Sequence, residues 1–545
     1  MCNLSPGSSQ EKESDEVSIA VAVAAPLIPV VHVTKRAWEK KTGAEEMNKF
    51  LSWLSVAEAI EEGILLFRLS FPIAITALFL YSRSLVSMLF LGFLGDVSLA
   101  AGSMALAFAN ITGYSVLSGL SLGMEPLCSQ AFGAKQPKLL SLTLYRAVLF
   151  LLCSSLPITF LWVNMSKVLL FLGQDAEITA LAQSYIIFSL PDLFSFSIIH
   201  PIRIFLRSQG LTRPLTFAAV LATAVNLAAS LLLVTLLRLG VAGVAAASAI
   251  SNLSFLLFLC LYLHLVHPAV QGCPWNSPGR PTVEWVTGWG PLARLAAPSC
   301  VSVCLEWWWY ELMILLCGLL PQPKPAVASM GVLIQTTALL YVFPSSLGFG
   351  VSTRVGNELG AQRPARARLS AAVAVAVSGG LALAALTFAT GMRYRWGKMF
   401  TDDGEILSLT AAALPIVGLC ELGNCPQTVG CGVLRGSARP AHAAQVNMGA
   451  FYFVGMPVAV GLGFGLGFGF CGLWMGLLSA QLCCAGFMLY VVWNTDWESQ
   501  THRAQLLTTS GHPPAGEIHK ADSEKVTEEK CFKPFISIKV AEMER

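Results

Sequence analysis

Residues 118–137 read SGLSLGMEPLCSQAFGAKQP, and residues 345–364 read SSLGFGVSTRVGNELGAQRP. The two stretches share a Ser-x-Leu-x-x-Gly motif and a Gly-Ala-x-x-Pro motif at an offset of 227 residues. Three further pairs repeat in the same order at nearly the same offset: Arg68-Leu69-x-x-Pro72 with Arg294-Leu295-x-x-Pro298, Leu206-Arg207 with Leu434-Arg435, and Gly240-x-x-Gly243 with Gly469-x-x-Gly472. The chain is therefore an internal duplication.

Both halves are strongly apolar. Of the 545 residues, 55% are hydrophobic and 12% charged, and the mean hydropathy is +0.64. A soluble domain carries roughly a quarter of charged residues, so this composition predicts a protein of the lipid bilayer. Many secondary transporters are duplicated membrane bundles with the substrate site between the halves. The sequence contains no extended basic face of the kind that would indicate a nucleic-acid partner.

Twelve apolar segments predict an all-α polytopic fold. Backbone polar groups in lipid must be paired within the protein, so long spans of this kind are helices. We expect two pseudo-symmetric six-helix lobes around a central cavity. The segments are 64–94, 97–124, 139–163, 178–206, 214–237, 243–267, 291–319, 326–352, 367–391, 405–432, 443–463 and 470–493.

The remaining sequence sets the domain limits. We expect an N-terminal cytoplasmic arm over residues 1–60, with an amphipathic helix near the membrane surface that ends at Glu61-Glu62. The first lobe covers residues 61–267 and the second 291–495. Residues 268–290, rich in Pro and Gly, form a cytoplasmic linker, and the polar residues 496–545 predict a disordered cytoplasmic tail.

The distribution of Lys and Arg predicts the orientation. Fourteen are assigned to the even-numbered connections, including Arg203, Arg207, Arg354 and Arg435, and six to the odd-numbered ones. By the positive-inside rule, the even-numbered connections and both termini face the cytoplasm.

Motifs of enzymes and cofactor sites are present only as chance matches. Gly119-x-Ser121-x-Gly123 matches a hydrolase pattern but lies in an apolar segment, where helix packing through small residues is expected. Gly467-x-Gly469-x-x-Gly472 matches a dinucleotide pattern, but no strand precedes it. The fifteen cysteines include no Cys-x-x-Cys pair. We expect no enzyme activity, no cofactor and no metal site.

Four carboxylates lie inside predicted spans, where a charged group costs roughly 2.5–3.5 kcal/mol and needs a partner, water or a proton. Glu306 and Glu311 align with Leu80 and Leu85 of the other half, so the duplicate lacks them. Desolvation penalises the charged form of such a group and makes it suitable for proton exchange, which favours Glu306 as the coupling carboxylate. Asp192 and Glu421 occupy matching places, which fits either a coupling role or a structural one.

Aromatic and amide side chains accompany two of these acids. Residues 304–311 read CLEWWWYE. Trp309 and Tyr310 follow Glu306 by three and four residues and share its helical face, where their rings could hold an organic cation or a flat solute. Trp307 and Trp308 are expected to pack against lipid or at the interface. Asn424 and Gln427 follow Glu421 along a similar face and are further candidates for the cavity wall.

Four segments of the chain resemble the multidrug and toxic compound extrusion (MATE) family, in its plant DETOXIFICATION branch. They read GMEPLCSQAFGAKQ, CLEWWWYE, PSSLGFGVSTRVGNELGA and CELGNCPQTVGCGVLRGSARP, and the resemblance spans residues 60–497. It implies alternating access and export of organic cations, alkaloids, flavonoids, organic acids or hormones against protons or sodium. The helix-seven Glu of the family falls on Glu306. Its helix-ten Asp falls on Asn424 and its helix-one Asp on or near Ser87, so Glu421 is left to compensate.

These observations favour a proton-coupled antiporter of organic solutes. Its partners are a small-molecule organic solute, protons or sodium, and the lipid bilayer, and we expect a monomer. The resemblance implies an endosomal, Golgi or vacuolar membrane rather than the plasma membrane. One alternative is a lipid or lipid-linked flippase, which needs a strongly cationic cavity, whereas the charges found within these spans are mainly acidic. Another is a non-transporting scaffold whose polar tail recruits partners.

Overall fold

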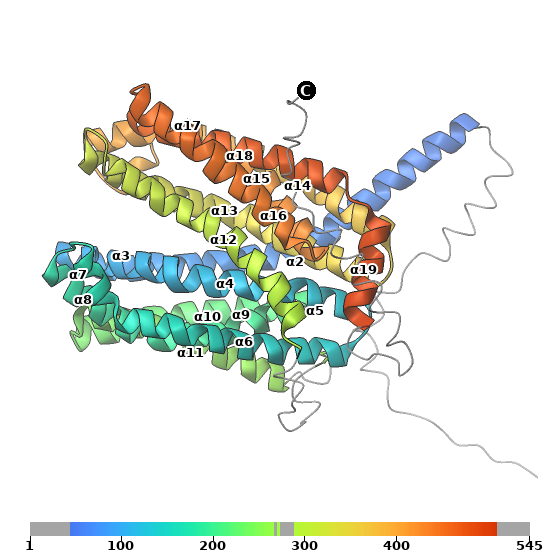
Figure 1. Ribbon diagram of the computed structural model, residues 1–545, viewed down its shortest axis with the longest axis horizontal. Coiled ribbons are helices and arrows are strands. Elements are labelled where there is room, and N and C mark those ends of the chain that lie inside the picture. The colour runs from blue at the N-terminus through green and yellow to red at the C-terminus, as the bar shows by residue number, and fades with distance from the viewer. Residues whose placement is uncertain (1–43, 266–269, 273–287, 510–545) are drawn as a thin grey trace, which may run out of the picture. The chain divides into compact units, whose positions relative to one another are not determined.

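The computed structural model describes residues 44–265, 270–272 and 288–509, and nearly all of them lie in helices (Figure 1). The chain divides into two units, Met1–Glu61 and Glu62–Arg545. The described part of the first unit is the start of helix α2, Ala44–Phe93. Because α2 runs without interruption, the predicted end of an amphipathic helix at Glu61-Glu62 is wrong. Most of the expected arm and linker, and residues 510–545 of the expected tail, lie outside the described residues.

The first bundle is built from α2 and the helices that follow it up to residue 265. Pro is the first or second residue of three of them, where a helix needs no backbone N–H donor. They are α3 (Asp96–Ala109), η1 (Asn110–Tyr114), α4 (Ser115–Leu122), α5 (Met124–Gly133), α6 (Pro137–Val163), α7 (Met165–Phe171), α8 (Ala176–Phe188), α9 (Leu190–Ser208), α10 (Arg213–Ser230), η2 (Leu231–Leu236) and α11 (Gly240–Leu265).

The second bundle repeats this plan. In Figure 1 its yellow-to-red helices α13–α18 lie above the blue-to-green helices α3–α11. Its helices are α12 (Gly290–Cys317), α13 (Pro323–Gly360), α14 (Pro364–Met392), η6 (Gly397–Met399), α15 (Gly404–Gly436), α16 (Pro440–Asn447), η7 (Met448–Gly455), α17 (Met456–Val460), η8 (Gly461–Gly465), α18 (Gly469–Trp493) and α19 (Trp497–Thr509).

The expected number of spans fits this arrangement. Among the described residues, 11 helices are long and apolar enough to cross a membrane, and the bent pair α8 and α9 gives a twelfth. The two members of that pair meet at an angle of 43°. The all-α polytopic fold predicted from the hydropathy pattern is confirmed.

The duplication is visible in the geometry of the turns. Lys135 and Gln362, at matching positions, have φ angles of 55° and 60°. Gly210 and Ala438, at another matching pair, have φ angles of 75° and 57°. Residues other than Gly rarely adopt this left-handed backbone conformation, so the two halves have kept the same uncommon turns.

The segment after the last span corrects the expectation of a tail that is disordered from residue 496. Residues Trp497–Thr509 form α19, which lies against α13, α14 and α5. Its Trp497 and Ala504 are buried in one apolar cluster with Leu66 and Val492. Burial of an aromatic ring and its neighbours stabilises a short helix that has little intrinsic reason to form alone.

Two close helix contacts join the bundles. Helix α12 packs along α4, and α13 packs along α5. A Cβ atom at Gly119 would lie 2.5 Å from Cα of Cys300, and one at Gly123 would lie 2.4 Å from Cα of Ala296. The packing predicted for these small residues is confirmed. Glycine lets α4 and α12 approach to backbone contact.

Candidate functional site: a cavity between the bundles and its closure

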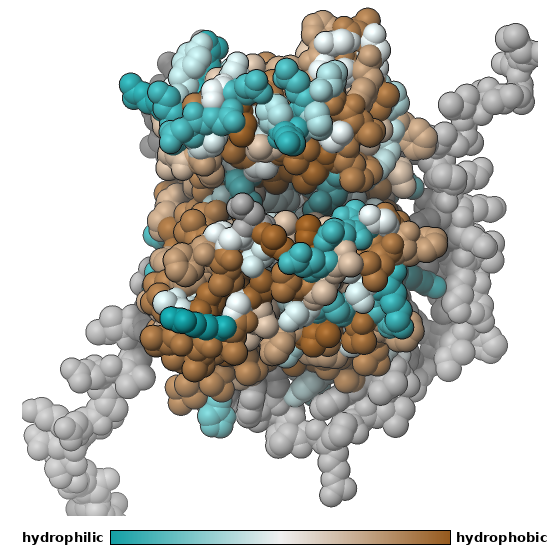
Figure 2. Space-filling view, turned by 90° about the vertical axis from the view of Figure 1, so that its left-hand side faces the viewer, coloured by the Kyte–Doolittle hydropathy of each residue, from teal (hydrophilic) through white to brown (hydrophobic). Residues whose placement is uncertain are grey.

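A cavity of about 280 Å³ lies between the two bundles. Its wall comprises two residues of η1, five of α12 between Glu306 and Glu311, and four of α13 between Ile334 and Tyr341. In Figure 2 the surface is hollowed between the two halves, and hydrophilic residues lie in the hollow. Binding sites of secondary transporters occupy this place in duplicated bundles.

Glu306 lies in the wall of this cavity. Its carboxylate has hydrogen-bond partners in the amide of Gln427 on α15 and the hydroxyl of Tyr341 on α13, and the positive charge of Arg435 acts on it. Neutral donors of this kind can hold either form of a carboxyl group, whereas a permanent guanidinium contact would fix the charged form.

Glu421 lies in the same bundle but is only 1% exposed. Nδ2 of Asn424 donates a hydrogen bond of 2.9 Å to its Oε2, and Sγ of Cys425 lies 3.5 Å from the same oxygen. Glu421 and Glu306 act on each other electrostatically, and both act on Tyr310. The structure thus brings four of the predicted residues together in the second bundle: Glu306 and Tyr310 in the wall, Glu421 and Gln427 behind it.

The three tryptophans of α12 are arranged differently from the expectation. Trp309 is fully buried, with its ring centroid 5.6 Å from that of Phe451 and 6.3 Å from that of Tyr452. It belongs to the apolar core and does not line the cavity. Trp308 and Trp307, expected to face lipid or the interface, do line it. Nε1 of Trp308 donates to the carbonyl of Ile111 across the bundle interface at 3.2 Å.

Glu311 lines the same cavity as Glu306. Helix geometry places it five residues, or about 7.5 Å, further along α12. Asn424 is 2% exposed and holds Glu421, so it does not reach the cavity wall.

Asp192 lies apart from these groups, in the first bundle. Oη of Tyr114 donates to its Oδ2 at 2.8 Å, and Asn252 donates to its Oδ1. Asn252 in turn accepts a hydrogen bond from Arg83 of α2, which also donates to Ser251 at 3.3 Å. This chain links four helices of the bundle and leaves Asp192 well partnered.

The charge of the first bundle differs from the mainly acidic set expected within the spans. Arg83 lies within α2, and Arg203 and Arg207 lie within α9 rather than in a connection. The acidic expectation holds for the second bundle, where Glu306 and Glu421 lie. The charge within the spans therefore no longer argues against a flippase.

One side of the cavity is closed by a buried ion-pair cluster that joins the bundles. The carboxylate of Glu125 on α5 is 1% exposed. Its Oε1 lies 3.0 Å from Nη2 of Arg207 on α9, and its Oε2 lies 3.5 Å from Nε of Arg435 on α15. Both guanidinium groups also lie over the ring of Phe349, at 4.1 and 5.2 Å from its centroid. The buried acid with its two cationic partners and the ring of Phe349 therefore tie the two bundles together on this side.

Backbone contacts extend the closure. Nε2 of Gln130 on α5 donates to the carbonyl of Gly436 on α15 at 3.0 Å. A Cβ atom at Gly133 would lie 2.1 Å from the carbonyl oxygen of Asn357, and one at Gly360 would lie 2.1 Å from that of Gln130. Gly133 and Gly360 occupy matching positions of the two halves, so α5 and α13 contact each other through the same position of the repeat.

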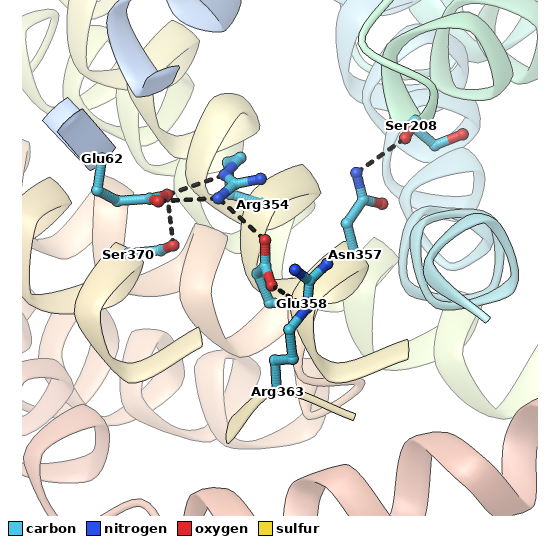
Figure 3. A network of polar contacts seen from close by, with 7 residues as sticks. All are labelled: Glu62, Ser208, Arg354, Asn357, Glu358, Arg363 and Ser370. Carbon is cyan, nitrogen blue, oxygen red and sulfur yellow. Dashed lines mark hydrogen bonds and ion pairs between the residues drawn. The ribbon is translucent and has the colours of Figure 1, made fainter. Parts of the chain in front are cut away.

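A polar network beside this closure holds α2 against the second bundle (Figure 3). Arg354 donates from Nε and Nη2 to the two oxygens of Glu62, at 2.8 Å each, and Ser370 donates to the same carboxylate at 2.6 Å. Arg354 also pairs with Glu358 at 3.0 Å. Bidentate pairs of this geometry are stronger than ordinary surface ion pairs.

Asn357 connects this region to the first bundle. Its Nδ2 donates to the carbonyl of Ser208, the last residue of α9, at 3.2 Å (Figure 3). The closure is thus made of one ion cluster, two glycine contacts and two amide hydrogen bonds.

Two bundles around a central cavity that is sealed on one side are the arrangement of a membrane transporter. Comparisons with known proteins agree. The family model described as MatE matches residues 72–232 and 298–460. The chain is 59% identical over 453 residues to Protein DETOXIFICATION 51 of Arabidopsis thaliana, covering 83% of this chain and 84% of that one. Protein DETOXIFICATION 52 of the same plant is 57% identical over 468 residues, covering 86% and 91%.

Solved structures show the same fold. The crystal structure of the eukaryotic MATE transporter AtDTX14 matches with a TM-score of 0.79 and 29% identity, over 83% of this chain and all of that one. The chain belongs to the MATE family of membrane transporters.

Sequence reasoning missed the closure. Glu125 stands just beyond the end of a predicted span, so it did not qualify as an intramembrane acid. Arg207 and Arg435 were recognised as a repeated pair but were used only for orientation. Their recurrence in both halves was the available signal.

Proposed function

We propose that this MATE transporter exports organic solutes from the cytoplasm in exchange for protons, with Glu306 as the coupling carboxylate. One observation carries the proposal: Glu306 lies in the cavity wall, where the amide of Gln427 and the hydroxyl of Tyr341 contact its carboxylate. Glu421 and Asp192 are buried behind hydrogen-bonded side chains.

The cavity and its closure suggest how exchange proceeds. With the cavity open to the acidic side, Glu306 takes a proton and the solute leaves. With the cavity open to the cytoplasm, Glu306 loses the proton and solute binds again. Arg435 acts on both Glu306 and Glu125, and therefore connects the ion site to the closure.

The driving force is adequate for this cycle. One proton that moves down 100 mV releases about 2.3 kcal/mol, and one pH unit adds about 1.4 kcal/mol. Exchange of one proton for one neutral solute then supports a gradient of several hundred-fold. Such a gradient is sufficient for removal of a toxic or signalling compound.

The other candidate residues receive supporting roles in this scheme. Gln427 and Tyr341 orient the carboxyl group of Glu306. Glu421, held by Asn424, is a second acid whose charge acts on Glu306. Tyr310 and Glu311 face the solute from the cavity wall, Trp309 supports that wall from the core, and Asp192 fixes the helices of the first bundle.

The orientation follows from the distribution of basic residues. The closed side, where Arg207, Arg354, Arg363 and Arg435 gather, is the cytoplasmic side by the positive-inside rule. We place both termini there, and we place the protein, as a monomer, in an endosomal, Golgi or vacuolar membrane.

The test uses the full chain in proteoliposomes with a fluorescent organic cation as the solute and with proton and sodium gradients imposed separately. We expect a pH gradient to drive uptake, and Glu306→Gln to reduce that uptake at least tenfold. Glu405→Gln, an exposed acid at the start of α15, is the matched control and should transport normally. Undiminished proton-driven uptake by Glu306→Gln would exclude this residue from coupling, and uptake driven by sodium alone would exclude protons.

A further inference from the structure

A stripe of polar and aromatic side chains runs along one face of α9. Asp192, Phe196, His200, Arg203 and Arg207 follow one another at intervals of three or four residues, the spacing that aligns side chains on a helix. The two ends of the stripe are held by partners. Asp192 accepts the hydrogen bond from Tyr114, and Arg207 pairs with Glu125. The stripe therefore faces the helices around the central cavity.

Helix α9 is closely surrounded by other helices. It packs against α4, α5, α6, α8, α11 and α13, and no residue from Asp192 to Ser208 is exposed. Phe196, His200 and Arg203 are nevertheless partly accessible. Because both ends of the stripe, Asp192 and Arg207, meet partners inside the molecule, we take this accessible surface to face the interior as well. Arg203 lies one turn before Arg207 in α9, further from the closure and nearer the middle of the helix.

No acid in the described part of the chain pairs with Arg203. Among the residues that the structure describes, it makes no hydrogen bond and no ion pair. The charged neighbours that act on it are Arg83 and Arg207, both positive. Asp192 is eleven residues away along the helix, or about 16 Å, and is already partnered. An unpaired cation within a membrane bundle is costly, so it marks a candidate functional site.

The duplicate half does not repeat this feature. With Arg207 aligned on Arg435, His200 aligns with Thr428 and Arg203 with Cys431. The second bundle instead places Glu306 in the cavity wall. A scaffold requirement of the fold would act on both halves, so the arginine serves something that meets only the first bundle.

We propose that Arg203 and His200 form an oxyanion subsite, which binds a carboxylate, sulfonate, sulfate or phosphate group of the transported solute. A guanidinium presents two parallel N–H donors that match such groups, and the adjacent imidazole adds a third donor. The ring of Phe196, 5.1 Å from that of His200, forms an apolar wall beside them. The subsite rests on the proposed transport function and specifies it: the solutes include organic anions and zwitterions, with the acidic group in the first bundle.

The experiment is equilibrium binding to the purified full chain in detergent at fixed pH, with no gradient. The probes are 1-naphthalenesulfonate, which is anionic at every working pH, and the neutral 1-naphthalenesulfonamide of nearly the same shape. We expect the wild type to bind the sulfonate at least tenfold more tightly than the sulfonamide. Arg203→Gln should abolish this preference, Arg203→Lys should restore part of it, and Arg363→Gln, a half-exposed arginine outside the stripe, should keep it.

Two outcomes would overturn the subsite. One is a wild type that binds both probes equally, a result that does not depend on whether any variant folds. The other is a folded Arg203→Gln that keeps the full preference. Because binding is measured without a gradient, failure of proton coupling at Glu306 leaves this test unaffected, and the two proposals can fail separately.

Discussion

Arg207 and Arg435 stand 228 residues apart at matching positions of the two halves, and they meet at one buried carboxylate. The duplicated fold supplies one arginine from each bundle. Glu125 has no equivalent in the other half, since Ser352 occupies the matching position. A single acid between two symmetry-related cations can hold the bundles together on this side only while both remain close.

The first prediction concerns this acid. Glu125→Gln leaves two arginines buried without a partner in the closed form, whereas water solvates them once the closure opens. Removal of one member of a buried ion pair costs about 3 kcal/mol or more, which favours the open form by roughly a hundredfold. Cys128, fully buried one turn further along α5, reports the change. Its alkylation by N-ethylmaleimide, followed by mass spectrometry, should accelerate by at least tenfold.

A matched control exists in the second bundle. Glu358 is also a buried acid held by two arginines, Arg354 and Arg363, but all three belong to α13 and the turn after it. Glu358→Gln should lower the stability of the protein and leave the alkylation of Cys128 nearly unchanged. Equal acceleration in both variants would show that general loosening, rather than release of the closure, exposes the thiol.

The second prediction concerns Gly133 and Gly360. Alanine at either position places a methyl group about 2.1 Å from a backbone carbonyl of the opposite helix, which cannot rotate away. We expect each variant to push α5 and α13 apart and to destabilise the closed form by about 1–3 kcal/mol. Faster labelling of Cys128 and slower coupled uptake should follow. The double variant should add little to either single one, because both disturb the same contact.

Gly379 of α14 provides the control for the glycine series. A Cβ atom there meets nothing within 4 Å. Gly379→Ala should leave the closure intact and stabilise its helix by up to about 1 kcal/mol. If it slowed transport as much as Gly133→Ala, the steric account of the closure would be wrong.

Much of the fold could be predicted because the signals are local or repeated. Long apolar runs specify helices in lipid, and the Gly-Ala-x-x-Pro motif ends one helix and begins the next in both halves. The helix α19 could not be predicted in this way. Its sequence is polar overall, and it is stabilised by burial of Trp497 against residues that lie far away in the chain, such as Leu66.

The candidate site was predicted in part, for a related reason. Helical spacing correctly placed Tyr310 and Glu306 on one cavity wall, and it also placed Trp309 there. Successive residues of a helix differ by about 100° in direction. A rotation of α12 about its axis by part of that angle therefore decides which of the two adjacent tryptophans faces the cavity. Only the packing of Phe451 against Trp309 settles that rotation, and Phe451 lies 142 residues away.

The last prediction separates these two tryptophans. Trp309 is fully buried, and Trp309→Ala should lower stability by about 3–5 kcal/mol, the cost of a large cavity in a core. Trp308 is 39% exposed and lines the cavity, so Trp308→Ala should change stability far less. Its loss should instead weaken solute binding by roughly two- to tenfold, the value of one aromatic contact. Thermal unfolding in detergent and equilibrium binding of an aromatic solute, measured on the same preparations, give both quantities.

Trp308→Phe keeps a ring without the hydrogen bond to Ile111, and should retain most of the affinity for the aromatic solute. A large loss of stability in Trp308→Ala, together with a mild effect of Trp309→Ala, would mean that α12 is rotated differently about its axis. Glu306 lies in the same turn as these two residues, so its assignment to the cavity wall would then be wrong as well.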